Sequence, residues 1–203
     1  ACEKCCHWSM ALELLARLVS VRIQADTIAY NAAISACQRG AQVSKASELL
    51  LFMRVTNIEP SAFTYNAAIG SADGLGCWAS SLALLGSMRH DGIVAGTVSH
   101  NTAVTACERG GYWPGALEVF GLARAGYVRS SVVTIGAATS ACATSGLWSR
   151  ALEICNAAAR ASIESSDVAM GAVATACERE GRWSAAAELL RSMEGKRVIA
   201  TIV

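Results

Sequence analysis

The stretch ACERGGYWPGALEVF, residues 106–120, decides the fold, because its landmarks recur along the whole chain at one spacing. Its tryptophan and its cysteine both belong to sets whose members are 35 residues, or twice that number, apart. The in-phase residues are Trp8, Trp78, Trp113, Trp148 and Trp183, and Cys2, Cys37, Cys107, Cys142 and Cys177. Self-similarity at a fixed period of tens of residues indicates a repeat architecture.

Two further markers keep the same register without an insertion. The segment ALEVF at 116–120 recurs as ALELL at 11–15, ASELL at 46–50, ALEIC at 151–155 and AAELL at 186–190. The segment YNAAI at 30–34 returns at 65–69, and as HNTAV at 100–104. The chain therefore divides into units 27–61, 62–96, 97–131, 132–166 and 167–201, with 1–26 as a partial unit and 202–203 as the start of another. We expect the array to continue beyond both ends.

Each unit predicts two helices. In the third unit the first helix is expected over 98–109, Gly110 and Gly111 break it, and the second helix is expected over 113–124. Pro114 is tolerated in the first turn, where its missing N–H has no intrahelical partner. Because a lone hairpin cannot bury its apolar face, we predict an all-α fold, an α-solenoid of stacked antiparallel helix-turn-helix hairpins. The in-phase tryptophan is interpreted as a wedge between successive hairpins.

The composition argues against a disordered chain and a membrane-spanning segment, and it restricts how the chain could bind nucleic acid. Of 203 residues, 53% are hydrophobic and 16% charged, which is too apolar for a disordered chain. No purely apolar run reaches the roughly 20 residues that a membrane span needs, so no membrane association is expected. The formal net charge is +1, so nucleic-acid binding would depend on local placement of charge.

The reactive side chains suggest no catalytic or metal site. The in-phase cysteines are expected to be small buried apolar groups, too far apart for disulfides. Cys2, Cys5, Cys6 and His7 have metal-compatible spacing, but no second pair follows, so no metal or cofactor is predicted. Phosphate-binding loops and nucleophile motifs are absent from the sequence, which predicts neither an enzyme nor a small-molecule substrate.

The period of 35, the TYNAAI start at 64–69, the glycine between helices, the ALELL segment and the IEPS ending at 58–61 resemble pentatricopeptide repeats. The variant at 106–113 resembles the version abundant in dinoflagellate algae, and the resemblance covers essentially the whole chain. It implies binding of single-stranded RNA, one base per repeat, in a plastid or mitochondrion, serving RNA processing, stability or translation.

The resemblance also implies roles for particular positions. The fifth residue of each unit would hydrogen-bond the base edge, the last residue would assist, and the second residue would sandwich the base. The fifth residues are Asn31, Asn66, Asn101, Gly136 and Gly171, and the last residues are Ser61, Gly96, Ser131, Ser166 and Thr201, with Asp26 ending the partial unit. The second residues are Ile28, Phe63, Val98, Val133 and Val168. An asparagine at the fifth position together with a serine at the last position resembles the residue pairs that favour pyrimidines in this family. Because glycine offers no side chain, the last two units are expected to read no base, or to read one through shape alone.

Structural alternatives stand beside each of these roles. The asparagines could instead cap a helix locally or link neighbouring hairpins, and the valine and isoleucine second residues could be ordinary core between repeats. Lys4, Arg39, Arg109 and Arg179 share one phase at the end of the first helix. At this position a cation could contact an RNA phosphate, or it could simply interact favourably with the negative end of the helix dipole. The competing function is a scaffold for protein partners, favoured by the near-neutral charge and the two glycine-bearing units.

Overall fold

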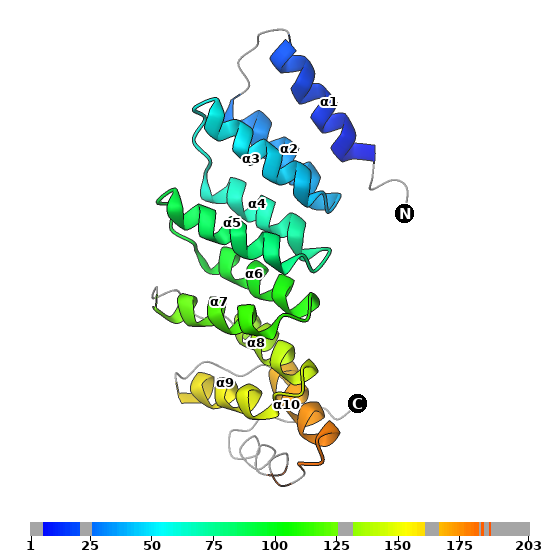
Figure 1. Cartoon of the computed structure of the whole chain (residues 1–203), viewed down its shortest axis with the longest axis vertical. Helices are drawn as coiled ribbons and strands as arrows, with labels where there is room; N and C mark the ends of the chain where they lie inside the picture. The colour runs from blue at the N-terminus through cyan, green and yellow to red at the C-terminus, as the bar shows by residue number, and fades with distance from the viewer. Residues whose placement is uncertain are drawn as a thin grey trace.

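The computed structural model describes residues 6–20, 26–125, 132–160, 167–182, 184 and 187, and every regular element in these ranges is a helix. Helix α1 spans Cys6–Ser20 and belongs to the partial unit. The first helices of the five units are α2 (Thr27–Arg39), α4 (Ala62–Asp73), α6 (Thr97–Arg109), α8 (Val132–Thr144) and α10 (Asp167–Arg179). The second helices are α3 (Val43–Val55), α5 (Trp78–His90), α7 (Trp113–Ala125) and α9 (Trp148–Arg160). Figure 1 shows them stacked along the long axis of the molecule, which confirms the predicted all-α solenoid.

The helices form two layers. Successive first helices pack directly on one another, in the order α2, α4, α6, α8 and α10. Each second helix packs on its own first helix and on the first helix of the next unit (Figure 1). Successive second helices make no comparable contact within the described ranges. The first helices therefore form the more closely packed layer, and we call their solvent-exposed side the first-helix face.

Local chemistry sets where the helices begin. The Asp26 carboxylate accepts a hydrogen bond from the backbone N–H of Ala29 at 2.9 Å and so caps α2. At α4, the Ser61 hydroxyl accepts from the N–H of Thr64, and the Thr64 hydroxyl accepts from the N–H of Ser61. This reciprocal capping box stabilises the first turn of α4.

The turn inside each hairpin requires a left-handed residue. Four units have glycine there, Gly76, Gly111, Gly146 and Gly181, all with positive φ. The first unit has Ala41, whose φ of 52° carries a steric cost that glycine avoids. The predicted glycine break is thus a backbone requirement.

The in-phase tryptophan lies between hairpins, as predicted. The Trp78 ring stacks on Tyr112, from the turn of the following unit, with ring centroids 3.9 Å apart. The Arg182 guanidinium lies 5.4 Å from the centroid of Trp148 in the equivalent place. A Cβ added to Gly110 would lie 2.6 Å from Trp78 Cδ1, so this turn needs a glycine to approach the ring.

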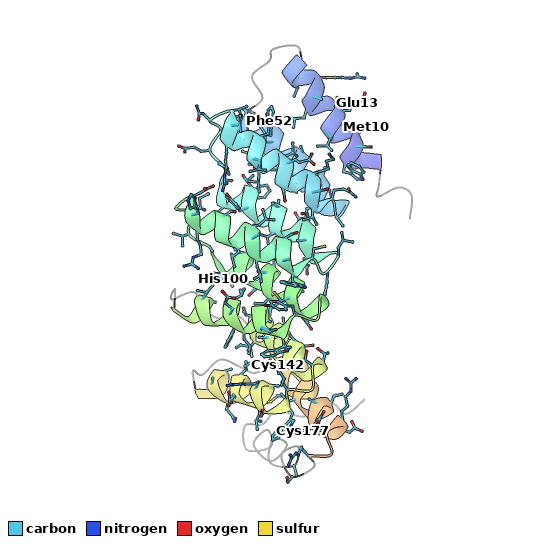
Figure 2. All side chains as sticks on the ribbon, in the orientation of Figure 1. Met10, Glu13, Phe52, His100, Cys142 and Cys177 are labelled. Carbon is cyan, nitrogen blue, oxygen red and sulfur yellow. The ribbon has the colours of Figure 1, made fainter. Side chains whose placement is uncertain are left out.

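The in-phase cysteines whose side chains are described belong to the core. Cys37, Cys107, Cys142 and Cys177 are free thiols with no solvent exposure, and Figure 2 labels the last two. Burial raises the pKa of Cys107 and of Cys142 to about 11, so both stay neutral thiols near pH 7. This confirms the expectation of small apolar groups.

Within the part of the chain that the structure describes, no group of three or more histidine, cysteine or acidic side chains could hold a metal ion. The cluster Cys2, Cys5, Cys6 and His7 lies outside the described side chains. None of the described helices has the length and apolar character needed to cross a bilayer.

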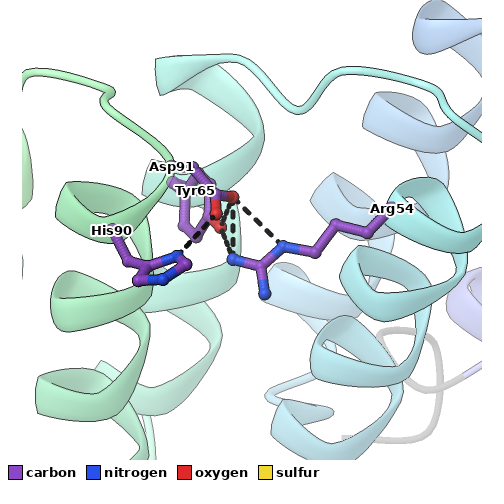
Figure 3. Close-up of polar contacts among 4 residues, drawn as sticks. All are labelled: Arg54, Tyr65, His90 and Asp91. Atoms are coloured by element: carbon purple, nitrogen blue, oxygen red, sulfur yellow. Dashed lines mark hydrogen bonds and ion pairs between the residues drawn. The ribbon is translucent and has the colours of Figure 1, made fainter.

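A polar cluster joins the first two units (Figure 3). Arg54, near the end of α3, forms an ion pair with Asp91 at 2.7 Å, and Tyr65 donates its hydroxyl hydrogen to the same carboxylate at 2.5 Å. Partial burial works against the charged carboxylate, but the bonds from Tyr65 and Arg54 outweigh it and lower the pKa of Asp91. Burial raises the pKa of Tyr65 to about 12, and its bond to Asp91 adds to this shift.

Candidate nucleic-acid interface

A row of apolar side chains is exposed on the first-helix face. Ile28 is 75% exposed, Phe63 and Val98 are 60% exposed, and Val133 is 59% exposed. Each is the second residue of its unit, so successive first helices present them in register. The interpretation of Ile28, Val98 and Val133 as core between repeats is therefore wrong. The side chain of Val168 lies outside the described residues.

The three predicted asparagines lie on the same face. Asn31, Asn66 and Asn101 follow the apolar residue by three positions on the same helix, which places the two side chains about one turn apart. All three are half-buried. Each lies inside its helix beyond the cap, so the interpretation as a local N-cap is wrong.

Each asparagine bonds to the next hairpin instead. Its Oδ1 accepts a hydrogen bond from the hydroxyl of the third residue of the following unit: Thr64 on Asn31 at 2.6 Å, Ser99 on Asn66 at 2.6 Å, and Thr134 on Asn101. With the carbonyl bound in this way, the donor that each carboxamide can offer a base is Nδ2. The hairpin-to-hairpin alternative is confirmed, and it is compatible with base contact.

The last two units differ on this face. Gly136 is buried in α8, and Gly171 is exposed in α10. A Cβ added to Gly171 would have no atom within 4 Å. Neither unit presents a polar side chain at the fifth position.

The last residues of the units occupy helix starts. Asp26 and Ser61 cap α2 and α4, whereas Gly96 stands at the N-cap of α6 and has no side chain to bond with. The Ser61 hydroxyl is 3.0 Å from the Thr64 hydroxyl, so Thr64 connects the last and fifth residues of the first unit. Ser131, Ser166 and Thr201 lie outside the described residues.

The basic residues stand at the far end of the first helices. Arg109 follows Val98 by eleven residues, about three helical turns, so both lie on one side of α6. Its guanidinium is 3.3 Å from the Asp73 carboxylate of the preceding unit. Arg39 and Arg179 are exposed, and Lys4 lies outside the described residues. Acidic Glu108 and Glu178 directly precede Arg109 and Arg179, which offsets the local positive charge at these two positions but not at Arg39.

The hydroxyls of Thr64, Ser99 and Thr134 are functional candidates that the sequence reasoning missed. A signal was present, because each is the third residue of the unit that follows an asparagine-bearing unit. The unit that follows Gly136 has Ala169 at that place.

Comparisons with known proteins agree with this geometry. A family model of the pentatricopeptide repeat domain matches residues 13–73, and a model of the PPR repeat matches residues 168–198. The fold is similar to the pentatricopeptide repeat protein PPR10 from maize, with a TM-score of 0.69 and 22% identity, over 93% of this chain and 27% of that one. The chain thus spans about a quarter of the maize protein.

A second solved structure is similar over most of both chains. It is the PPR domain of protein-only RNase P 1 from Arabidopsis thaliana in complex with tRNA, with a TM-score of 0.68 and 12% identity. The match covers 83% of this chain and 89% of that domain. No curated protein sequence matches the chain. At these identities, both structural likenesses concern the fold.

Proposed function

Because the chain is a pentatricopeptide repeat protein, we propose that it binds single-stranded RNA along its first-helix face, with one base for each asparagine-bearing repeat. The observation that carries this proposal is the row of exposed apolar side chains, Ile28, Phe63, Val98 and Val133. Exposed apolar groups at one-repeat intervals suit flat bases, which bury their faces against such side chains.

The asparagines supply hydrogen bonds to the base edge. A base held between the second residues of two successive units would face the fifth residue of the first, because Asn66 follows Phe63 by three positions on α4 and bonds to Ser99, the residue after Val98. The Nδ2 donor suits the carbonyl oxygens of uracil and cytosine, and the ring N3 of cytosine, which carries no hydrogen. We expect pyrimidines opposite Asn31 and Asn101, whose units end in serine.

Phosphate contact is a minor part of the proposal. Arg39 and Arg179 are exposed, but Glu178 directly precedes Arg179, and Arg109 is paired with Asp73. We therefore expect weak binding by these repeats alone, decreasing further with salt. We further propose that the protein acts without catalysis, as an adaptor in plastid or mitochondrial RNA processing, stability or translation.

A fluorescence anisotropy titration tests the proposal. The probes are labelled octamers of uridine, cytidine and adenosine, at about 50 and 200 mM salt. The variant Val98→Asp/Val133→Asp should bind at least about tenfold more weakly, because it places charge where bases would stack. The matched control is Val55→Asp on α3, where the native valine is 81% exposed. Equal affinities for the two variants would refute the proposed face.

A protein-interaction scaffold is the second candidate. It is favoured by Leu51, Phe52 and Val55, which are exposed on the second helix α3 (Figure 2 labels Phe52). Absence of saturable binding to all three octamers at low salt would support this candidate over RNA binding.

A further inference from the structure

Each of the three asparagines accepts a hydrogen bond from a buried hydroxyl of the next unit. We propose that this hydroxyl determines which base the asparagine selects. Thr64, Ser99 and Thr134 are then positioning residues that act through the carboxamide. The inference rests on the proposed RNA binding and deepens it, because it adds a residue from the next repeat to the determinants of base selectivity.

The burial of these hydroxyls makes their bonds persistent. Thr64 and Ser99 have no solvent exposure and Thr134 has 1%. Water therefore does not compete for them, and a buried hydroxyl that lost its partner would stay desolvated and unsatisfied. Each hydroxyl holds its asparagine Oδ1 on the protein side.

The contacts around Thr64 show which way the bond runs. Its Oγ1 accepts the backbone N–H of Ser61 at 3.0 Å, so its own hydrogen is available to donate to Asn31 Oδ1, 2.6 Å away. An asparagine that accepts from the protein presents Nδ2 to the ligand. A carboxamide free to rotate by half a turn could instead offer a donor or an acceptor, and so would discriminate less between bases.

The fifth residue of one unit and the third residue of the next unit vary together along the chain. Three asparagines are followed by a hydroxyl at the third position of the next unit, in Thr64, Ser99 and Thr134. Gly136, which has no carboxamide to hold, is followed by Ala169. A purely packing role for the third position would not require this correspondence.

The test removes the hydroxyls and keeps the asparagines. Ser99→Ala/Thr134→Val is the test variant, because Thr64 also belongs to the capping box of α4. The matched control is Thr139→Val in α8, where the native threonine is equally buried and its hydroxyl contacts Cys155 at 3.8 Å. Ser99→Thr/Thr134→Ser keeps both hydroxyls and should behave as the native protein.

The first readout is base selectivity, measured as the ratio of affinities for pyrimidine and adenosine octamers. We expect the test variant to lower this ratio by about tenfold, roughly threefold for each lost hydrogen bond, while the control and the swapped variant stay within about twofold. An unchanged ratio in the test variant, together with a ratio lost in Asn66→Ala/Asn101→Ala, would overturn the inference. A native protein that binds all octamers equally would overturn it as well.

The second readout needs no RNA. In nitrogen-15 NMR spectra, the side-chain N–H₂ signals of Asn66 and Asn101 should shift and show greater mobility in the test variant but not in the control. If the native protein bound none of the octamers, the proposed function would fail, and these spectra alone would decide whether the hydroxyls position the asparagines. Unchanged signals would overturn the positioning role.

Discussion

The units over 27–131 and those over 132–201 share one scaffold and differ in what they present to solvent. Both have first helices in a single layer, and Cys107 and Cys142 are equally buried in the two regions. Both also expose an apolar second residue, as Val98 and Val133 show. The first region adds asparagines held by hydroxyls from the next hairpin, whereas the second has Gly136 in place of an asparagine.

The difference indicates that the residues proposed for recognition are separate from those that stack the hairpins. Stacking depends on buried positions between helices, and most of these are apolar in the described units, with polar exceptions such as Ser71 and His100. In the proposed function, recognition would depend on the fifth and third positions, and these change to glycine and alanine in the second region without altering the helix pairing. If the proposed function holds, an array can keep its length while individual repeats lose the ability to read a base.

The largest expected effect is a loss of stability at alkaline pH. It tests whether the buried cysteines of the two regions behave alike. The pKa values of Cys107 and Cys142 are raised from 9.0 to about 11 by burial. A raised folded-state pKa gives stability that is fully present below the unfolded value and is lost as pH rises, here between about pH 9 and 11. We expect a loss on the order of 2–3 kcal/mol for each thiol.

Urea unfolding under reducing conditions, from pH 8 to pH 11, measures this loss. Cys107→Ala and Cys142→Ala should each reduce the alkaline loss by a similar amount. Tyr65, whose pKa is raised to about 12, should contribute only above about pH 10. If one cysteine substitution reduced the alkaline loss of stability much more than the other, the cores of the two regions would not be equivalent.

Removing the asparagines should make the first region resemble the second. The triple variant Asn31→Ala/Asn66→Ala/Asn101→Ala should lose roughly thirtyfold in affinity for a pyrimidine octamer, at about threefold for each hydrogen bond. Gly171→Ala, also at a fifth position, should stay within about twofold. Anisotropy titration measures both, and circular dichroism confirms that the helices persist. A triple variant with native affinity would assign the asparagines to hairpin packing alone.

The hairpin turn offers a reciprocal pair of substitutions, one in each region. Ala41→Gly should raise the free energy of unfolding by about 1 kcal/mol, because it relieves a non-glycine residue at a φ of 52°. Gly146→Ala, at a φ of 76°, should lower it by about 1 kcal/mol. Thermal and urea unfolding measure these changes, and effects of the same sign would contradict the assignment of backbone strain.

The smallest expected effect is the gain in stability on replacing a glycine inside a helix of the second region. Gly171 lies inside α10 with open space around the position of a Cβ, so Gly171→Ala should stabilise the protein by about 0.5–1 kcal/mol. Calorimetry measures the shift of the melting temperature. A destabilised variant would show that the glycine is needed for packing.

Much of the fold could be predicted from sequence because its determinants are local and repeated. The third unit was expected to have helices over 98–109 and 113–124, and α6 and α7 differ from these bounds by one residue at one end each. The buried cysteines and the wedge role of tryptophan also follow from the phase of the repeat. For the candidate site, the pattern identified the fifth-position asparagines but left open what they contact.

The sequence by itself determined the period, the two helices of each hairpin and the positions of the turns, because glycine breaks and helical periodicity act within a few residues. Only the tertiary structure decided that the second residues are exposed, that Arg54 meets Asp91, and that Thr64 bonds to Asn31. The two partners in each of these bonds are more than 30 residues apart and belong to different units. They meet only because of the angle at which one hairpin packs on the next, and that angle is set by the packing of the whole interface.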